Sequence, residues 1–386
     1  MKKTIAGIAI IAAGFGMQSG AQTNMTAPSW TDSITIKGDL RYRFETIGDD
    51  SKKDGSGDTY TRQRDRIRAR IGADAKVNDD VKVGIGFSTG GNDPISGNQT
   101  LGDGAGKKDM KLDVAYFDYN VLGSNPNEIH VVGGKMYNPF ITMNDDLCWD
   151  PDLRPEGLAV KSQFGGDFAT FYANGGYLWL QERDSKDPLT LYAGQAAVKL
   201  QFVPEASLTL GVAYDKYNNL KGTDVIDWQG ANSGYGNSTT KGSISGTTTN
   251  KAWASDFTPL MFFAQVDLWV EGLPLALFTQ QLDNNDASTN GKGYLYGVSL
   301  GKAKNPKTFE VGYSYSKLEK DATLGYWTDS DRWGGGTDGK GSKIYGKYQI
   351  MKNLQAGVTY FVDDKKISAA SPTDYSRLQV DLMASF

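Results

Sequence analysis

Apolar and polar residues alternate with a period of two along most of this chain, and no helical period of comparable length competes with that pattern. In the first clear run, Ile36, Leu40 and Tyr42 share one parity, while polar residues occupy the other. Successive side chains of a strand point to opposite faces of its sheet, so each run predicts a strand with one apolar and one polar face. We expect sixteen strands, beginning near residues 33, 62, 81, 110, 128, 157, 168, 190, 207, 256, 275, 292, 308, 342, 354 and 374.

The connections between these strands are alternately short and long. Short polar turns are expected at 78–80, 165–167, 204–206, 304–307 and 351–353. Long loops rich in Gly, Ser, Asp and Asn are expected near 48–61, 89–108, 217–255 and 319–341. Short periplasmic turns and long extracellular loops are typical of outer-membrane barrels, in which a closed sheet pairs every backbone polar group. The sequence therefore predicts an all-β fold, a transmembrane antiparallel β-barrel. The alternative is a secreted, soluble β-protein, but the closely spaced aromatic residues on the apolar face favour lipid.

The N-terminal segment has the features of a secretory signal peptide. Lys2 and Lys3 precede the apolar stretch 5–15, and the small residues Ser19 and Ala21 stand at the positions that a signal peptidase requires. We expect residues 1–21 to be removed and residues 22–386 to form the barrel. Loss of the two lysines changes the formal charge from -4 to -6, and this mildly acidic balance gives no reason to expect nucleic acid as a partner.

The composition offers little chemistry for catalysis or metal binding. One cysteine and one histidine exclude an internal disulfide framework, a thiolate metal cluster and a histidine-rich zinc site. The segment 297–301 matches the G-x-S-x-G nucleophile motif, but that motif needs a strand–turn–helix and a later histidine. Here it lies inside an alternating run, and His130 comes far upstream. We therefore expect no enzyme and no cofactor.

Two neighbouring segments, 134–140 (GKMYNPF) and 146–159 (DLCWDPDLRPEGLA), carry a family resemblance. Together with the arginine-rich second strand and the terminal Phe386, they make the chain similar to the "putative porin" family of Gram-negative bacteria. The resemblance implies a pore-forming barrel in the outer membrane. It also implies contact with outer-membrane lipid and lipopolysaccharide, insertion by the barrel-assembly machinery with Phe386 as the assembly signal, and a homotrimer by analogy with general porins.

Arginines of one parity mark the face of the second strand that is expected to line a pore. A barrel of sixteen strands is wide enough to leave a water channel, and the side chains that line it set its selectivity. Arg66, Arg68 and Arg70 stand opposite the apolar positions of their strand, and Arg41 and Arg43 lie on the neighbouring one. The alternative, a set of solvated charges that pair with loop carboxylates, suits residues 62 and 64 near the rim.

The loop after the fifth strand, residues 138–156, is acidic. In general porins the third external loop folds into the lumen, and by strand count this is that loop. An acidic loop facing an arginine wall would set an electric field across the pore. The alternatives are a solvated surface loop or a calcium site, although the spacing does not follow the EF-hand pattern. The acidic candidates for the constriction are Asp145, Asp146, Asp150, Asp152 and Glu156.

These observations predict an outer-membrane porin that admits small hydrophilic solutes and ions by passive diffusion. The arginine stripe would also suit a channel specific for an anion such as phosphate. A barrel enzyme or an adhesin that uses the long loops is a third, less favoured class.

Overall fold

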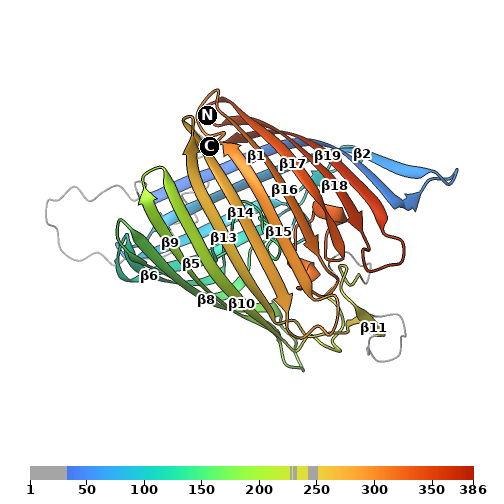
Figure 1. The fold of residues 1–386 in the computed structure, drawn as a ribbon, viewed down its shortest axis with the longest axis horizontal. Helices are drawn as coiled ribbons and strands as arrows, with labels where there is room; N and C mark the ends of the chain where they lie inside the picture. The colour runs from blue at the N-terminus through green and yellow to red at the C-terminus, as the bar shows by residue number, and fades with distance from the viewer. Residues whose placement is uncertain (1–32, 227, 229–232, 242–250) are drawn as a thin grey trace. The chain divides into compact units, whose positions relative to one another are not determined.

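The computed structural model describes residues 33–226, 228, 233–241 and 251–386. The expected signal peptide lies outside these ranges. Sixteen long antiparallel strands of the described chain form a closed barrel (Figure 1), and β1 pairs with β19 from Asp39–Ser385 to Asp49–Tyr375. The strands are β1 (Ile34–Lys53), β2 (Thr59–Lys76), β3 (Val81–Thr89), β5 (Met110–Ser124), β6 (Asn127–Lys135), β7 (Glu156–Gly165), β8 (Ala169–Gln181), β9 (Leu189–Val203), β10 (Ala206–Asn218), β13 (Pro259–Val270), β14 (Leu273–Asn284), β15 (Lys292–Gly301), β16 (Phe309–Leu318), β17 (Gly339–Met351), β18 (Leu354–Lys365) and β19 (Thr373–Ser385).

The predicted fold class and strand number are confirmed, and each strand begins within three residues of its expected start. One connection differs from its prediction. The segment 48–61 was expected to be a long loop, but β1 continues to Lys53 and β2 begins at Thr59, so most of it is a β-hairpin that projects beyond the neighbouring strands (Figure 1). The tight turn at its tip explains the difference. The Asp54 carboxylate accepts hydrogen bonds from the backbone N–H groups of Ser56 and Asp58, and Gly57 has a φ of 86°.

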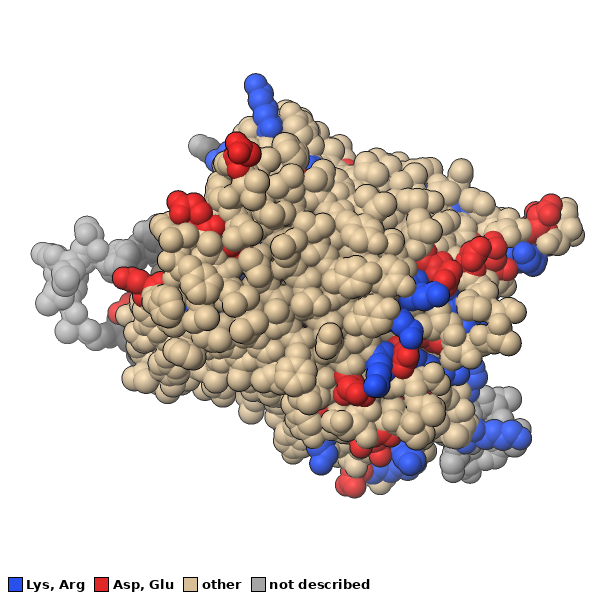
Figure 2. All heavy atoms as spheres, in the orientation of Figure 1, with Lys and Arg blue, Asp and Glu red and all other residues tan. Residues whose placement is uncertain are grey.

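The outer face of the barrel is apolar. Along each strand, exposed residues such as Tyr294 and Tyr296 alternate with buried ones such as Leu295. Figure 2 shows a broad surface over the middle of the barrel without charged side chains, which gather toward its two ends. Such a surface is stable in a bilayer, because the closed sheet leaves no strand edge exposed to hydrocarbon. No helix in the described part of the chain is both long and apolar enough to cross a membrane.

The two ends of the barrel differ in their connections. At the short-turn end, β7 joins β8 through residues 166–168 and β17 joins β18 through residues 352–353. At the long-loop end, β3 joins β5 through a segment that contains the short strand β4 (Gln99–Thr100). The connection between β10 and β13 contains the two-stranded sheet of β11 (Thr239–Lys241) and β12 (Lys251–Trp253). The other long connections are residues 136–155 and 319–338.

Part of the barrel interior is filled by a hydrophobic core. Inward side chains of β9, β14 and β15 pack there against residues from the long loops. The ring of Trp327 lies 5.4 Å from that of Trp149 and 6.1 Å from that of Tyr217. Trp253 and Phe257 are fully buried. Because packed apolar side chains leave few voids as large as a water molecule, this part of the interior is closed to water, and open volume has to lie elsewhere in the barrel.

Candidate functional site

The loop of residues 136–155 lies against the barrel interior and is fixed there by inward-facing amides. The Gln195 side chain of β9 accepts a hydrogen bond from the Ile141 N–H at 2.8 Å and donates one to its carbonyl at 2.9 Å. On β14, Gln280 accepts from the Leu147 N–H at 2.9 Å and donates to Asp146. Since β9 and β14 stand on different parts of the wall, these bonds hold the loop across the lumen.

Asp145 ties this loop to the far wall. Its carboxylate accepts a hydrogen bond from the Ser314 hydroxyl of β16 at 2.8 Å and from Arg332 at 2.9 Å, and Lys343 of β17 lies 3.5 Å away. Burial acts to raise the pKa of Asp145, but the charges of Lys343 and Arg332 outweigh it and hold the pKa below its usual value. Asp145 is therefore a charged anchor for the loop.

Asp146 and Asp150 are buried by the loops themselves. Asp146 accepts hydrogen bonds from the N–H groups of Cys148 and Trp149, and burial raises its pKa to about 6. Asp150 accepts from the N–H of Ser330 at 3.0 Å and is only 4% exposed. Burial and neighbouring carboxylates raise its pKa well above the usual value. Both side chains brace the loop structure and do not contact the arginine stripe.

Asp152 is the acidic residue that meets the arginine stripe. It lies 3.0 Å from Arg68 and 3.3 Å from Arg70, and both arginines also bind Asp39 of β1. Burial acts to raise the pKa of Asp152, and the two arginines lower it below the usual value. Glu156, the last acidic candidate, is on β7, where it pairs with Lys135 at 2.8 Å. The acidic loop and the arginine wall were expected to face each other across the pore, and at Asp152 they are joined by direct ion pairs.

Nearer the long-loop end, the arginines of β1, β2 and β19 surround the carboxylates of Asp381 and Glu45. Arg43 forms two 2.7 Å hydrogen bonds with Asp381, one to each carboxylate oxygen. Glu45 is fully buried and accepts from Arg64 and Arg377, with Arg66 3.5 Å away. Arg43 and Arg377 also bind Asp331 of the loop 319–338. Most of the stripe is therefore paired, and it fastens a second loop to the wall.

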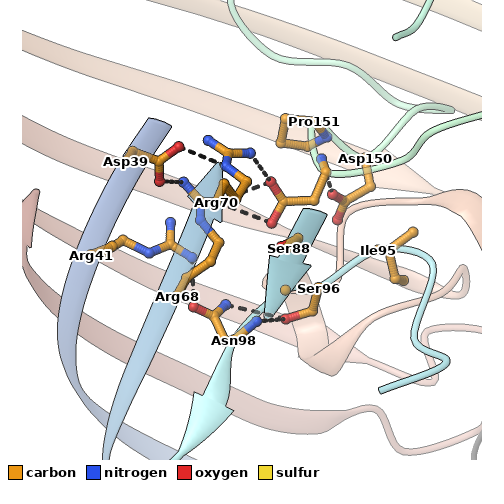
Figure 3. A network of polar contacts seen from close by, with 12 residues as sticks. Asp39, Arg41, Arg68, Arg70, Ser88, Ile95, Ser96, Asn98, Asp150 and Pro151 are labelled. Atoms are coloured by element: carbon orange, nitrogen blue, oxygen red, sulfur yellow. Dashed lines mark hydrogen bonds and ion pairs between the residues drawn. The ribbon is translucent and has the colours of Figure 1, made fainter. Parts of the chain in front are cut away.

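The loop that follows β3 completes the site, a role that was not predicted for it. The Asn98 side chain accepts a 2.6 Å hydrogen bond from Arg41, and its backbone carbonyl accepts one from Arg66 at 3.1 Å. No carboxylate of the described chain lies within ion-pair distance of Arg41. Asp93 of the same loop is partly buried, which raises its pKa to about 6. Figure 3 shows Arg41, Arg68 and Asn98 converging between β1, β2 and this loop. The only available sequence signal was the concentration of Gly, Asn and Asp in 90–98, which also suits a solvated loop.

We call Asp39, Arg41, Arg66, Arg68, Arg70, Asp93, Asn98 and Asp152 the arginine–aspartate cluster. It separates two cavities. The outer cavity, of about 840 Å³, lies toward the long-loop end and is lined by Arg62, Arg64 and Arg66 among others. The inner cavity, of about 530 Å³, is lined by Arg70 and Asp152. Asp93 and Ser96 line both cavities, so the two volumes meet at the cluster.

The calcium alternative finds no support in the geometry. The described residues contain no group of three or more His, Cys, Asp or Glu side chains arranged to hold a metal ion. The acidic candidates of the loop instead bind arginine, lysine, amide and backbone donors.

The C-terminal residue closes the seam of the barrel. The N–H and carbonyl of Phe386 both pair with Gly38 of β1 at 3.0 Å. A Cβ atom at position 38 would lie 2.5 Å from the Phe386 ring, so the close approach requires glycine. The ring itself is 65% exposed on the outer face.

A closed sixteen-stranded barrel with an apolar outer face and a charged interior defines an outer-membrane β-barrel of the porin class. The chain belongs to the family described as "Putative porin", whose model matches residues 56–244 and 276–386. This family and fold place the protein in the outer membrane of a Gram-negative bacterium. No curated protein matches the sequence.

Solved structures of outer-membrane proteins share the fold at low sequence identity. OprB of Pseudomonas putida is 11% identical, with a TM-score of 0.59 over 92% of this chain and 95% of that one. Salmonella typhi OmpF, in complex with daunomycin, is 13% identical, with a TM-score of 0.54 over 93% and 99%. OmpT of Vibrio cholerae with loop L8 deleted is 13% identical, with a TM-score of 0.50 over 92% and 100%. At these identities, the similarity shows the fold alone.

Proposed function

We propose that the protein is a passive channel for small hydrophilic solutes and ions, and that its conduction path follows the wall formed by β1, β2 and β19. The observation that carries this proposal is the pair of cavities, of about 840 and 530 Å³, which share Asp93 and Ser96. The arginine–aspartate cluster is then the bottleneck. The apolar core against β9, β14 and β15 confines water to the opposite side of the barrel.

The charges of the bottleneck favour anions. The cluster contains four guanidinium groups, those of Arg41, Arg66, Arg68 and Arg70, and three carboxyl groups, those of Asp39, Asp93 and Asp152. One positive charge remains when all three carboxyl groups are ionised. Because the low-dielectric wall focuses the field in a narrow aqueous path, even one net charge biases which ions enter. We expect a weakly anion-preferring channel.

A channel specific for one anion is the second candidate, and the lining of the outer cavity favours it. Seven basic side chains line that cavity against three acidic ones, Asp49, Asp93 and Asp338. The basic residues are Lys52, Arg62, Arg64, Arg66, Lys365, Lys366 and Arg377. A specific channel would retain its anion at this site, so its current would saturate.

The remaining expectations rest on the porin family. We propose that the long-loop end faces the cell exterior, that lipopolysaccharide surrounds it, and that the barrel-assembly machinery inserts the chain. A homotrimer is an analogy with general porins.

Conductance in planar bilayers tests the channel directly. An ohmic current in KCl, with reversal potentials that indicate a modest anion preference, supports the diffusion channel. A current that saturates with the concentration of one anion supports the specific channel. A correctly folded, inserted protein without measurable current would overturn both and favour an enzyme or adhesin.

A further inference from the structure

The outer cavity contains cationic side chains that the fold leaves available. Arg62 of β2 and Lys366, which follows β18, both line the cavity and are exposed. Within the described part of the chain, neither has a carboxylate within ion-pair distance. Their neighbours are committed elsewhere, since Arg64 binds Glu45 and Lys365 binds Asp49 at 3.0 Å. The free charges are therefore Arg62 and Lys366.

The two free charges, Arg62 and Lys366, lie three strand spacings apart around the barrel wall. In the barrel, β2 is followed by β1, β19 and β18, so three interstrand spacings of about 4.8 Å separate the two backbones by about 14 Å along the sheet. Their long side chains can shorten this span, but an ion with one acidic group can pair fully with only one of them. An anion with two separated acidic groups can engage both.

The fold holds the backbone at both positions in place. Arg62 projects from a strand that is paired in the barrel sheet. Lys366 lies in a turn that Asp338 organises: its carboxylate accepts hydrogen bonds from the N–H and hydroxyl of Ser368 at 2.8 Å each, and its carbonyl accepts one from the Ile367 N–H at 3.2 Å. A site whose backbone is already positioned loses less conformational entropy when it binds.

We propose that the outer cavity binds organic anions that carry two separated acidic groups, such as sugar bisphosphates, and holds them between Arg62 and Lys366. This inference rests on the proposed channel and names its ligand class. The volume of about 840 Å³ falls within the range of small-molecule sites. Guanidinium and ammonium groups both bind phosphate, and guanidinium can form two parallel hydrogen bonds to it.

Block of the chloride current distinguishes one acidic group from two. Fructose 1,6-bisphosphate and fructose 6-phosphate, added separately to each side of a planar bilayer, should block wild-type channels with different half-blocking concentrations. We expect the bisphosphate to act at a concentration at least about tenfold lower, because a second charge-assisted hydrogen bond contributes about that factor. The block should be stronger from one side, since the cavity lies at one end of the barrel.

Matched variants assign the block to the two residues. Arg62→Gln and Lys366→Gln should each raise the half-blocking concentration of the bisphosphate about tenfold and leave that of the monophosphate within about threefold. Lys186→Gln, an exposed lysine of the loop 182–188 that does not line the cavity, should change neither.

Equal block by the two sugars, or a bisphosphate block that neither Arg62→Gln nor Lys366→Gln weakens, would overturn the site. Binding of the bisphosphate to detergent-solubilised protein, followed by calorimetry, gives a second readout that does not need conduction. Binding of the bisphosphate without any chloride current would support this site and overturn the channel, whereas current without block or binding would overturn only the site.

Discussion

Arg66→Gln tests whether the bottleneck charge sets ion preference. Arg66 lines the outer cavity. Its guanidinium is one of four in the arginine–aspartate cluster, which contains three carboxyl groups and so has one excess positive charge. The replacement therefore makes the cluster neutral at pH 7. Its partner Glu45 remains compensated by Arg64 and Arg377, and the Arg66 Nε is a buried N–H without an acceptor. We expect a loss of about 1 kcal/mol of stability, the contribution of one hydrogen bond.

The electrical effect should be large enough to measure. An ion passing about 5 Å from a unit charge interacts with it by about 0.8 kcal/mol in water, and more strongly beside a low-dielectric wall. That energy corresponds to about a fourfold change in permeability for either sign of ion. In a tenfold KCl gradient, with an ideal limit of about 59 mV, the reversal potential should move toward cation preference by tens of millivolts.

Two comparisons make the result interpretable. Arg68→Gln removes the same charge but breaks its ion pairs with Asp39 and Asp152, which Arg70 then pairs alone. It should therefore cost more, about 1.5–3 kcal/mol, and lower the thermal stability of the barrel. The shift for Arg66→Gln should also be larger in dilute salt, because the Debye length is ~30 Å at 0.01 M and ~3 Å at 1 M. Identical reversal potentials for wild type and Arg66→Gln in dilute salt would show that the cluster does not face the conduction path.

Three further predictions follow from the same structure. Because burial raises the pKa of Asp93 to about 6, this group binds a proton between pH 7 and 5. Anion preference should therefore increase over that range in wild type, and the increase should be smaller in Asp93→Asn. Gln280→Ala leaves the buried Leu147 N–H without its acceptor, which should lower the stability of the barrel by about 1–3 kcal/mol. The loosened loop should give larger and noisier single-channel currents. Unchanged current traces would argue against a fixed loop. Deletion of Phe386 removes a mostly exposed ring and the two backbone bonds to Gly38. We therefore expect slower membrane insertion and lower outer-membrane abundance, with a modest loss of stability. Normal membrane levels would contradict its role in assembly.

The barrel was predictable because lipid imposes a strict rule on every strand. Apolar and polar residues have to alternate in a strand that lies between lipid and a polar interior. The local sequence therefore predicts where the strands lie and which way Arg66, Arg68 and Arg70 face. The hairpin at 48–61 was missed because its Gly, Ser and Asp content suits a loop and a tight turn equally well. The alternation that lipid requires does not apply to this hairpin, because it projects past the other strands.

The loops inside the barrel follow no such local rule. The segment 90–98 lies inside because Asn98 meets arginines of β1 and β2, contacts between residues 32 and 57 positions apart. The acidic loop was assigned to the interior by analogy, but its partners were not predictable: Asp145 binds a residue 187 positions later in the chain. Trp149 and Trp327 were the local signal for buried loops, because a solvated loop has little reason to carry tryptophan.

The pairing of the arginine stripe explains how one wall can both hold loops and attract ions. A guanidinium in a narrow, partly desolvated space is costly unless a carboxylate or another acceptor satisfies it. Arg43, Arg68 and Arg377 meet this requirement with acids, two of which, Asp152 and Asp331, belong to loops. These pairs narrow the lumen and largely cancel their own field. The field that a permeating ion experiences then comes from the basic side chains without such a pair, among them Arg62, which lines the outer cavity. Different arginines of the same stripe therefore fix the loops and select the ion, and mutations can separate these two functions.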